Sequence, residues 1–378
     1  MAKLGDIATY INGYPFKPND WSDTGLPIIR IQDLTGNSYQ ANRYKGEYQP
    51  KYEVNAGDVL ISWSASLGVY IWQGEKALLN QHIFKVVFNK EAVSKDFFVF
   101  QVEQILKKAA QDVHGATMKH LTKPVFDALP FYLPSYEEQC NIANKLKYVR
   151  SIIEQRQEQL TKLDELVKAR FVEMFGDMLL NSLEWPEKPL ESLADIVSGI
   201  TKGRKTTETG LIEVPYMAVS NVKSGYIDWT TIKTILATKQ EIEQYRLMPD
   251  DILMTEGGDP DKVGRGAIIK NPLKDSIHQN HIFRVRLDKS ELLPAYFAEY
   301  LQHQKAKRYF LGCAKQTTGI ASINMRQLRA LPVLIPPLPL QNQFADFVAE
   351  VDKSKVEVQK ALDQTQLLFD SLMQQYFG

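Results

Sequence analysis

Residues 128–134 read ALPFYLP, and residues 330–336 read ALPVLIP, the same pattern 202 positions later. The spacing of 202 persists to MFG at 174–176 and YFG at 376–378. Weaker echoes precede these segments in the same order, namely HIFKV at 82–86 with HIFRV at 281–285, and GDVLI at 57–61 with DDILM at 250–254. The chain is therefore a duplication, and we expect two like halves related by a pseudo-two-fold axis.

A heptad pattern follows each of the two Leu-Pro segments. From residue 142 to 174, ten positions alternate steps of four and three, and eight of them are apolar; adding 202 gives a second set, again with eight apolar. Such a seam is typical of a coiled coil. The seam residues are Ile142, Leu146, Val149, Ile153, Leu160, Leu163, Val167, Phe344, Val348, Val351, Val358, Leu362, Phe369 and Leu372. We expect two helices, at about 137–175 and 339–377, to pair in antiparallel orientation; the alternative is that each seam packs on its own domain.

Short apolar runs separated by Gly, Pro and Asn precede each long helix and predict strands of a mixed domain. A shorter helix is expected in each domain, at 96–111 and at 294–311. The fold class is therefore α+β, with two mixed domains joined and separated by the two long helices. The expected boundaries are 1–135 for the first domain, 136–178 for the first helix, 179–336 for the second domain and 337–378 for the second helix.

Composition excludes several classes of protein. The chain has 45 Lys and Arg against 45 Asp and Glu, so it is not a diffuse polycation. It has no apolar run near 20 residues and no apolar signal at its start, so we expect no membrane span. Two cysteines do not make a disulfide framework, which favours a cytoplasmic location.

Catalytic and metal motifs are also missing. Asn271-Pro272 is followed by Leu273, so the chain lacks the Asn-Pro-Pro-Tyr type of motif expected of an adenine methyltransferase. Glycine-rich stretches at 257–260 and 264–266 do not match a phosphate-binding loop. His278 and His281 would face opposite sides of a strand. We therefore expect no catalytic, cofactor or metal site.

The pattern as a whole resembles the specificity subunit of type I restriction–modification systems. The resemblance spans essentially the whole chain and depends on LGDI at 4–7 echoed by LADI at 193–196, on 57–61, and on the Leu-Pro hinge before each long helix. Ala194 departs from Gly5 without evident consequence.

The family implies two target-recognition domains that each read half of a split site in double-stranded DNA. It implies that the helices act as a spacer and bind two methyltransferase subunits, with endonuclease and translocase subunits in the full complex. S-adenosylmethionine, ATP and Mg²⁺ are then expected in those partners.

Candidate DNA contacts lie in loops beside the predicted strands. Small residues, a carboxylate and cations suit base edges and phosphates. The candidates are Lys17, Arg30, Trp63, Ser64, Lys119, His120, Lys202, Arg204, Lys205, Glu256, Gly257, Lys262, Arg265 and Arg326. Alternatively, Trp63 fills the core, Glu256 is merely solvated, and Arg30 pairs with Asp33.

Two other functions compete with a DNA-reading subunit. The first is a coiled-coil adaptor whose duplicated domains bind proteins. The second is a stand-alone DNA-modifying enzyme with an unfamiliar motif, which the missing methyl-donor and nucleotide signatures disfavour.

Overall fold

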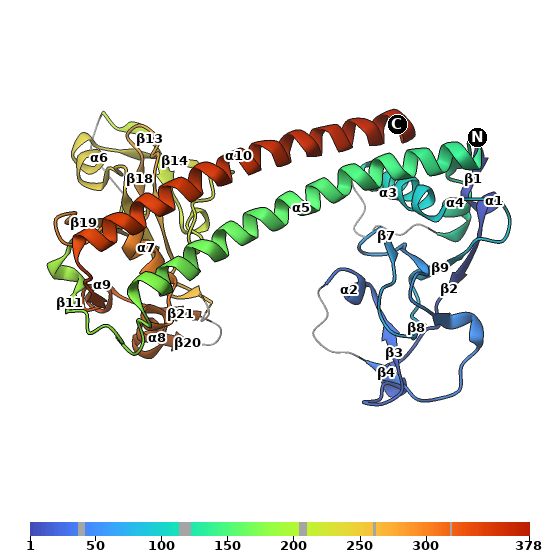
Figure 1. Cartoon of the computed structure of the whole chain (residues 1–378), viewed down its shortest axis with the longest axis horizontal. Helices are drawn as coiled ribbons and strands as arrows, with labels where there is room; N and C mark the ends of the chain where they lie inside the picture. Colours follow the sequence, from blue (N-terminus) through green and yellow to red (C-terminus); the bar gives the residue numbers. More distant parts are fainter. Residues whose placement is uncertain (37–41, 113–121, 204–209, 260–261, 318–319) are drawn as a thin grey trace. The chain divides into compact units, whose positions relative to one another are not determined.

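The computed structural model of the chain describes residues 1–36, 42–112, 122–203, 210–259, 262–317 and 320–378 (Figure 1). The chain divides into two compact units. Unit 1 contains residues 1–158 and 359–378, and unit 2 contains residues 159–358. Each unit therefore takes one half of each long helix, whereas the sequence analysis treats those helices as segments of their own.

Unit 1 is built from short strands followed by helices. Its strands are β1 (Ala2–Lys3), β2 (Thr9–Asn12), β3 (Leu26–Ile29), β4 (Arg43–Tyr44), β5 (Glu53–Val54), β6 (Val59–Ser62), β7 (Gly68–Ile71), β8 (Ala77–Leu79), β9 (Ile83–Val87) and β10 (Pro130–Phe131). Its helices are α1 (Leu4–Ile7), α2 (Ile31–Leu34), α3 (Lys95–Asp112), α4 (Lys123–Asp127) and the first half of α5 (Tyr136–Phe175).

Unit 2 repeats this plan. Its strands are β11 (Glu187–Pro189), β12 (Ala194–Ser198), β13 (Ile212–Met217), β14 (Lys233–Ala237), β15 (Asp251–Thr255), β16 (Gly257–Gly258), β17 (Gly266–Ile269), β18 (Ile277–His278), β19 (Ile282–Leu287), β20 (Lys315–Thr317), β21 (Ile320–Ser322) and β22 (Pro332–Leu334). Its helices are α6 (Lys239–Tyr245), α7 (Pro294–Gln302), α8 (Gln304–Cys313), α9 (Met325–Arg329) and the first half of α10 (Leu338–Phe377).

The main sheet has the same order in both units. It runs β2-β9-β6-β7 in unit 1 and β12-β19-β15-β17 in unit 2, and every neighbouring pair is antiparallel. A second sheet contains the parallel pair β3 and β8 in unit 1, and β13 and β18 in unit 2. The two units therefore share a topology, as the duplicated sequence predicts.

A glutamine fixes each Leu-Pro hinge at the start of a long helix. Gln139 is buried, donates from Nε2 to the Pro134 carbonyl at 3.0 Å, and accepts from the Ser94 backbone N–H at 2.9 Å. Gln341, 202 residues later, donates to the Pro336 carbonyl at 2.8 Å and accepts from a backbone N–H at 2.8 Å. The duplication thus extends to individual hydrogen bonds that set how each helix leaves its unit.

Both long helices have 40 residues, in agreement with the fixed spacing of 202. In unit 1, residues of the first half of α5 share a core with Phe369, Met373 and Phe377 of α10. In unit 2, the second half of α5 shares a core with Phe344 and Val351. Contacts of the first half of one helix with the second half of the other require an antiparallel pair, as predicted.

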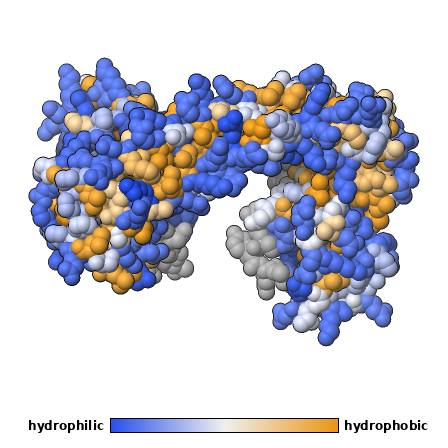
Figure 2. Space-filling model, in the orientation of Figure 1, coloured by the Kyte–Doolittle hydropathy of each residue, from blue (hydrophilic) through white to orange (hydrophobic). Residues whose placement is uncertain are grey.

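None of the fourteen seam residues is exposed. Six are half-buried, namely Leu160, Leu163, Val348, Val358, Leu362 and Leu372, and the other eight are buried. Other apolar residues of the helices face outward, and Figure 2 shows hydrophobic surface, in orange, along them. No helix in the described ranges is long and apolar enough to cross a membrane.

One element differs from the prediction. The single helix expected at 294–311 is two helices, α7 and α8, because His303 is extended, with φ −79° and ψ 155°. The His303 side chain accepts from the Lys305 backbone N–H at 3.4 Å and so caps the start of α8. Unit 1 has the uninterrupted helix α3 instead.

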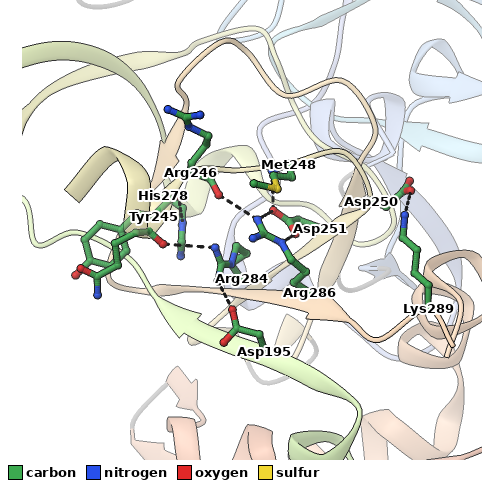
Figure 3. Close-up of polar contacts among 11 residues, drawn as sticks. Asp195, Tyr245, Arg246, Met248, Asp250, Asp251, His278, Arg284, Arg286 and Lys289 are labelled. Atoms are coloured by element: carbon green, nitrogen blue, oxygen red, sulfur yellow. Dashed lines mark hydrogen bonds and ion pairs between the residues drawn. The ribbon is translucent and has the colours of Figure 1, made fainter. Parts of the chain in front are cut away.

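A partly buried ionic network ties β15 to β19 in unit 2 (Figure 3). Arg286 donates from Nε and Nη2 to the two carboxylate oxygens of Asp251, both at 2.8 Å, and Asp251 is only 1% exposed. This pairing raises the pKa of Arg286. Arg284, also on β19, is buried and donates to Asp195 on β12. Ion pairs thereby link three neighbouring strands, and the two buried members, Asp251 and Arg284, each have an ionic partner, as the burial of charge requires.

Candidate nucleic-acid interface

One end of the main sheet gathers several of the predicted DNA contacts in unit 2. At this end β12 and β15 finish and β17 and β19 begin, since Ser198 lies opposite Phe283 and Thr255 lies opposite Ile282. The loops at this end carry what we call the strand-end cluster of unit 2: Lys202, Glu256, Lys262, Arg265 and His281.

The backbone of Glu256 is fixed on both sides. Its N–H donates to the His281 carbonyl at 3.0 Å, and its carbonyl accepts from the Ile323 N–H at 2.8 Å. Directly after it, β16 pairs with β21, and β21 pairs with β20. The structure thus joins two loops that the sequence analysis singles out separately, the one after β15 and the one that leads to Arg326.

Close packing of β16 against β21 explains the glycine at position 257. A Cβ atom there would lie 3.0 Å from the Ala321 carbonyl oxygen and 3.1 Å from the Ser322 Cβ. The glycine therefore lets two strands approach, whether or not nucleic acid lies beside it.

The cations of this region differ in their surroundings. Lys202 and Arg326 are exposed, and Arg326 lies in the first turn of α9. Lys262 forms an ion pair with Asp259 and lowers the pKa of that carboxyl. Arg265 is half-buried, and its Nε has no hydrogen-bond partner among the residues that the structure describes. The loops of this region thus hold the cations Lys202, Lys262, Arg265 and Arg326 together with the carboxylates of Glu256 and Asp259.

The same end of the unit 1 sheet carries Lys17, Trp63, Ser64 and His82, the strand-end cluster of unit 1. Trp63 and Glu256 are equivalent, because the Trp63 N–H donates to the His82 carbonyl at 3.2 Å just as Glu256 donates to His281. The Trp63 ring stacks on Phe84 at 5.6 Å, and its Nε1 donates to Asn12 at 3.3 Å. Ser64 is buried, so its hydroxyl is withdrawn from the surface, whereas Lys17 is exposed.

A glycine of each unit allows the strand-end loop to cross its neighbour. A Cβ on Gly13 would lie 2.0 Å from the Asn80 carbonyl oxygen, and one on Gly199 would lie 1.9 Å from that of His278. Lys17 and Lys202 follow these crossings, so the two lysines occupy corresponding loops.

Among the described residues, the Arg30 side chain does not pair with Asp33, and its contact with DNA stays a prediction. Arg30 follows β3 and precedes α2; its backbone N–H, not its side chain, donates to Asp33 at 2.8 Å. Its guanidinium lies over the Trp21 ring at 4.2 Å. It also donates to the Asn42 amide oxygen, at 2.6 and 2.9 Å, when that amide is oriented to accept.

Comparison with known proteins identifies the family. The model of the type I restriction modification DNA specificity domain matches residues 1–162 and again residues 182–365. The chain belongs to this family. The two matches correspond to the two halves of the duplicated sequence, so each half is one specificity domain with part of a long helix.

Relatives in the specificity family are similar over nearly their whole length. The EcoBI specificity subunit of Escherichia coli is 21% identical over 99% of this chain and 84% of its own, and the EcoKI subunit of Escherichia coli K12 is 21% identical over 100% and 88%. The MjaVIII subunit of Methanocaldococcus jannaschii is 23% identical over 96% and 89%. The crystal structure of the S subunit from M. genitalium shares the fold, with a TM-score of 0.56 at 14% identity over 100% and 95%.

Four of the candidate specificity-domain contacts lie outside the described residues: Lys119, His120, Arg204 and Lys205. They stay predictions. So do the contacts that the structure places.

His281 was not predicted from the sequence as a partner of Glu256. It was considered only as a metal ligand with His278, but His278 is buried in β18 and His281 is exposed before β19. Across the residues that the structure describes, no group of three His, Cys, Asp or Glu side chains could hold a metal ion. The available signal was the HIF sequence shared by residues 82–84 and 281–283.

Proposed function

We propose that this chain is the DNA sequence-specificity subunit of a type I restriction–modification enzyme and that each unit reads one half of a split site. One observation carries the division of labour. At equivalent positions of the two main sheets, unit 1 has the indole of Trp63 and unit 2 has the carboxylate of Glu256.

These two side chains would read different features of a base pair. A carboxylate accepts a hydrogen bond from an exocyclic amino group in the major groove. The indole of Trp63, whose Nε1 already donates to Asn12, would offer only apolar contact. Exposed lysines beside each, Lys17 and Lys202, suit phosphate contacts that position the protein without reading sequence. Two units of one topology would thus recognise two unlike half-sites.

The chain would act with partner subunits and provide no catalytic centre. Two methyltransferase subunits would dock along the long helices, where exposed apolar residues lie outside the seam in both units: Tyr148 and Leu367 in unit 1, Leu166 and Val356 in unit 2. Endonuclease and translocase subunits would join through them. S-adenosylmethionine, ATP and Mg²⁺ would be bound by these partners, and the complex would act in the cytoplasm, where its DNA is.

A domain exchange tests the proposal. Residues 1–135 are replaced by the matching domain of a relative with another target, the chain is combined with its methyltransferase subunits, and methylated sites are mapped by sequencing. One half of the site should change while the other stays.

A change in both halves would contradict independent reading. An assembly that forms but prefers no sequence in duplex DNA would instead favour the protein-binding adaptor. Light scattering on the same sample should give two methyltransferase subunits per chain; saturation at one would contradict the docking proposal.

A further inference from the structure

The carboxylate of Glu256 is held by a histidine. Its Oε2 lies 2.5 Å from Nδ1 of His281. The Glu256 side chain is 33% exposed and that of His281 is 57% exposed, so the pair lies at the surface. The other oxygen, Oε1, makes no hydrogen bond in the described part of the chain.

The direction of this hydrogen bond follows from the chemistry of the two groups. A carboxylate only accepts, so Nδ1 of His281 must carry the proton and donate. One oxygen is therefore engaged, and the other keeps its full capacity to accept. A hydrogen bond from the Glu256 N–H to the His281 carbonyl fixes the backbone of both residues. The ion pairs of Arg284 and Arg286 fix β19, the strand that follows His281.

Orientation matters because an isolated glutamate is flexible. Its side chain loses rotamer entropy when it is fixed. If the imidazole fixes the carboxylate before DNA binds, this entropy loss does not weaken the contact with the base. The fixed carboxylate also cannot rotate to accommodate an incorrect base.

We propose that His281 is a positioning residue for base recognition by unit 2, which holds Glu256 so that Oε1 accepts from the exocyclic amino group of a cytosine or adenine. The inference rests on the proposed function. Unit 1 has a histidine at the same place, but its ring contacts Trp63, with centroids 4.9 Å apart, so the same scaffold presents a ring in one unit and an oriented carboxylate in the other.

The test uses the chain assembled with its methyltransferase subunits and duplexes randomised in both half-sites. His281→Ala should reduce discrimination at one base pair, in the half read by unit 2, by roughly 5- to 30-fold, the factor that corresponds to about 1–2 kcal/mol. Binding to random duplex and the other half-site should not change. His281→Asn should restore most of the preference, because its amide can donate from nearly the place of Nδ1.

Two further variants complete the design. Lys289→Ala is the matched control, because Lys289 is also 57% exposed and paired with a carboxylate, Asp250, outside the strand-end cluster of unit 2. It should leave the motif unchanged. Glu256→Ala should relax the same base pair as His281→Ala, and the double variant should be no worse than Glu256→Ala alone.

Three outcomes would overturn the proposal. Discrimination that survives His281→Ala but not Glu256→Ala would show that the carboxylate needs no positioning. If His281→Ala weakens the base preference further in a chain that already carries Glu256→Ala, His281 acts independently of Glu256. If neither variant changes the motif while exchange of residues 179–336 still does, DNA reading by unit 2 stands and this cluster is not its reader.

Discussion

At the scale of single residues, His278 shows how one scaffold accepts different chemistry. Its backbone carbonyl accepts from Ile200, as the carbonyl of Leu79 accepts from Tyr14, so the two positions are equivalent. The buried ring of His278 lies between two carbonyl oxygens, with Nδ1 3.2 Å from that of Tyr245 and Nε2 3.3 Å from that of Val197. A neutral imidazole can donate to only one of them.

This burial predicts a pH dependence of stability. Desolvation lowers the pKa of His278 to about 4, from about 6.5 in an unfolded chain. As the pH falls from about 6.5 to about 4, His278 binds a proton in the unfolded chain but stays neutral in the folded chain. The free energy of unfolding should therefore fall in that window, by up to ~1.4 kcal/mol per pH unit. His278→Leu, which installs the residue of unit 1, should flatten this slope in urea unfolding measured from pH 4.5 to 7.

Val172→Ala serves as the control, since Val172 is an exposed residue of the same unit and its side chain does not titrate. It should keep the slope of the unaltered chain. Equal slopes for His278→Leu and the unaltered chain would show that other groups govern the acid response.

At the scale of elements, the second half of α5 is held in unit 2 by an aromatic cluster. Phe171 is 1% exposed, and its ring centroid lies 5.4 Å from those of both Tyr296 on α7 and Phe344 on α10. Phe171→Ala should lower the free energy of unfolding of unit 2 by about 3–5 kcal/mol, because it removes a ring from a closed core. Hydrogen exchange of the backbone amides of α7 and β15 would measure this loss in the free energy of unfolding.

The neighbouring Val172 provides the control, since it is 48% exposed. Val172→Ala should cost about 0.5 kcal/mol or less, as is usual for surface sites. A comparable loss from both variants would mean that α5 is not anchored through Phe171.

The elements that sequence could predict are those with a long repeating signal. Ten heptad positions define each long helix, and short apolar runs define β6, β9, β15 and β19. The break at His303 could not be predicted, because it has no glycine or proline and depends on a side-chain cap. The ribbon of β16, β20 and β21 has strands of two or three residues, too short for any periodicity, and β16 and β21 pair across about 60 residues of chain.

The candidate site divides in the same way. Glu256, Trp63 and the lysines were suggested by their place after strands, which topology then brought to one end of a sheet. The link between Glu256 and His281 depends on the register of β15 against β19, which no local pattern encodes. Ser64 had suitable chemistry, but its burial depends on packing.

At the scale of the whole molecule, unit 1 is assembled from two separate stretches of chain. Phe369, Met373 and Phe377 belong to its core, with Phe377 5.4 Å from Phe97 between ring centroids. Lys108 also donates to the Phe377 carbonyl at 3.1 Å. Deletion of residues 359–378 should therefore make unit 1 susceptible to limited proteolysis, while unit 2, residues 159–358, stays resistant.

A double substitution in the same stretch is the control. Leu367 and Leu368 are 70% and 51% exposed, so replacing both with serine should leave unit 1 protected. Equal protection of unit 1 with and without residues 359–378 would contradict its assignment as a discontinuous unit.

The discontinuity of unit 1 also determines the order in which the two units can fold during translation. Residues 1–158 emerge first, but the stretch that completes their core emerges only after the 200 residues of unit 2, 159–358. At typical rates of synthesis that interval is roughly 10–40 s, long compared with the folding of a small domain. Unit 2 can close in that time, whereas Phe97 and Phe100 wait without their partners on α10. The nascent chain should therefore need a chaperone for the half that is translated first, because that half is the last to be finished.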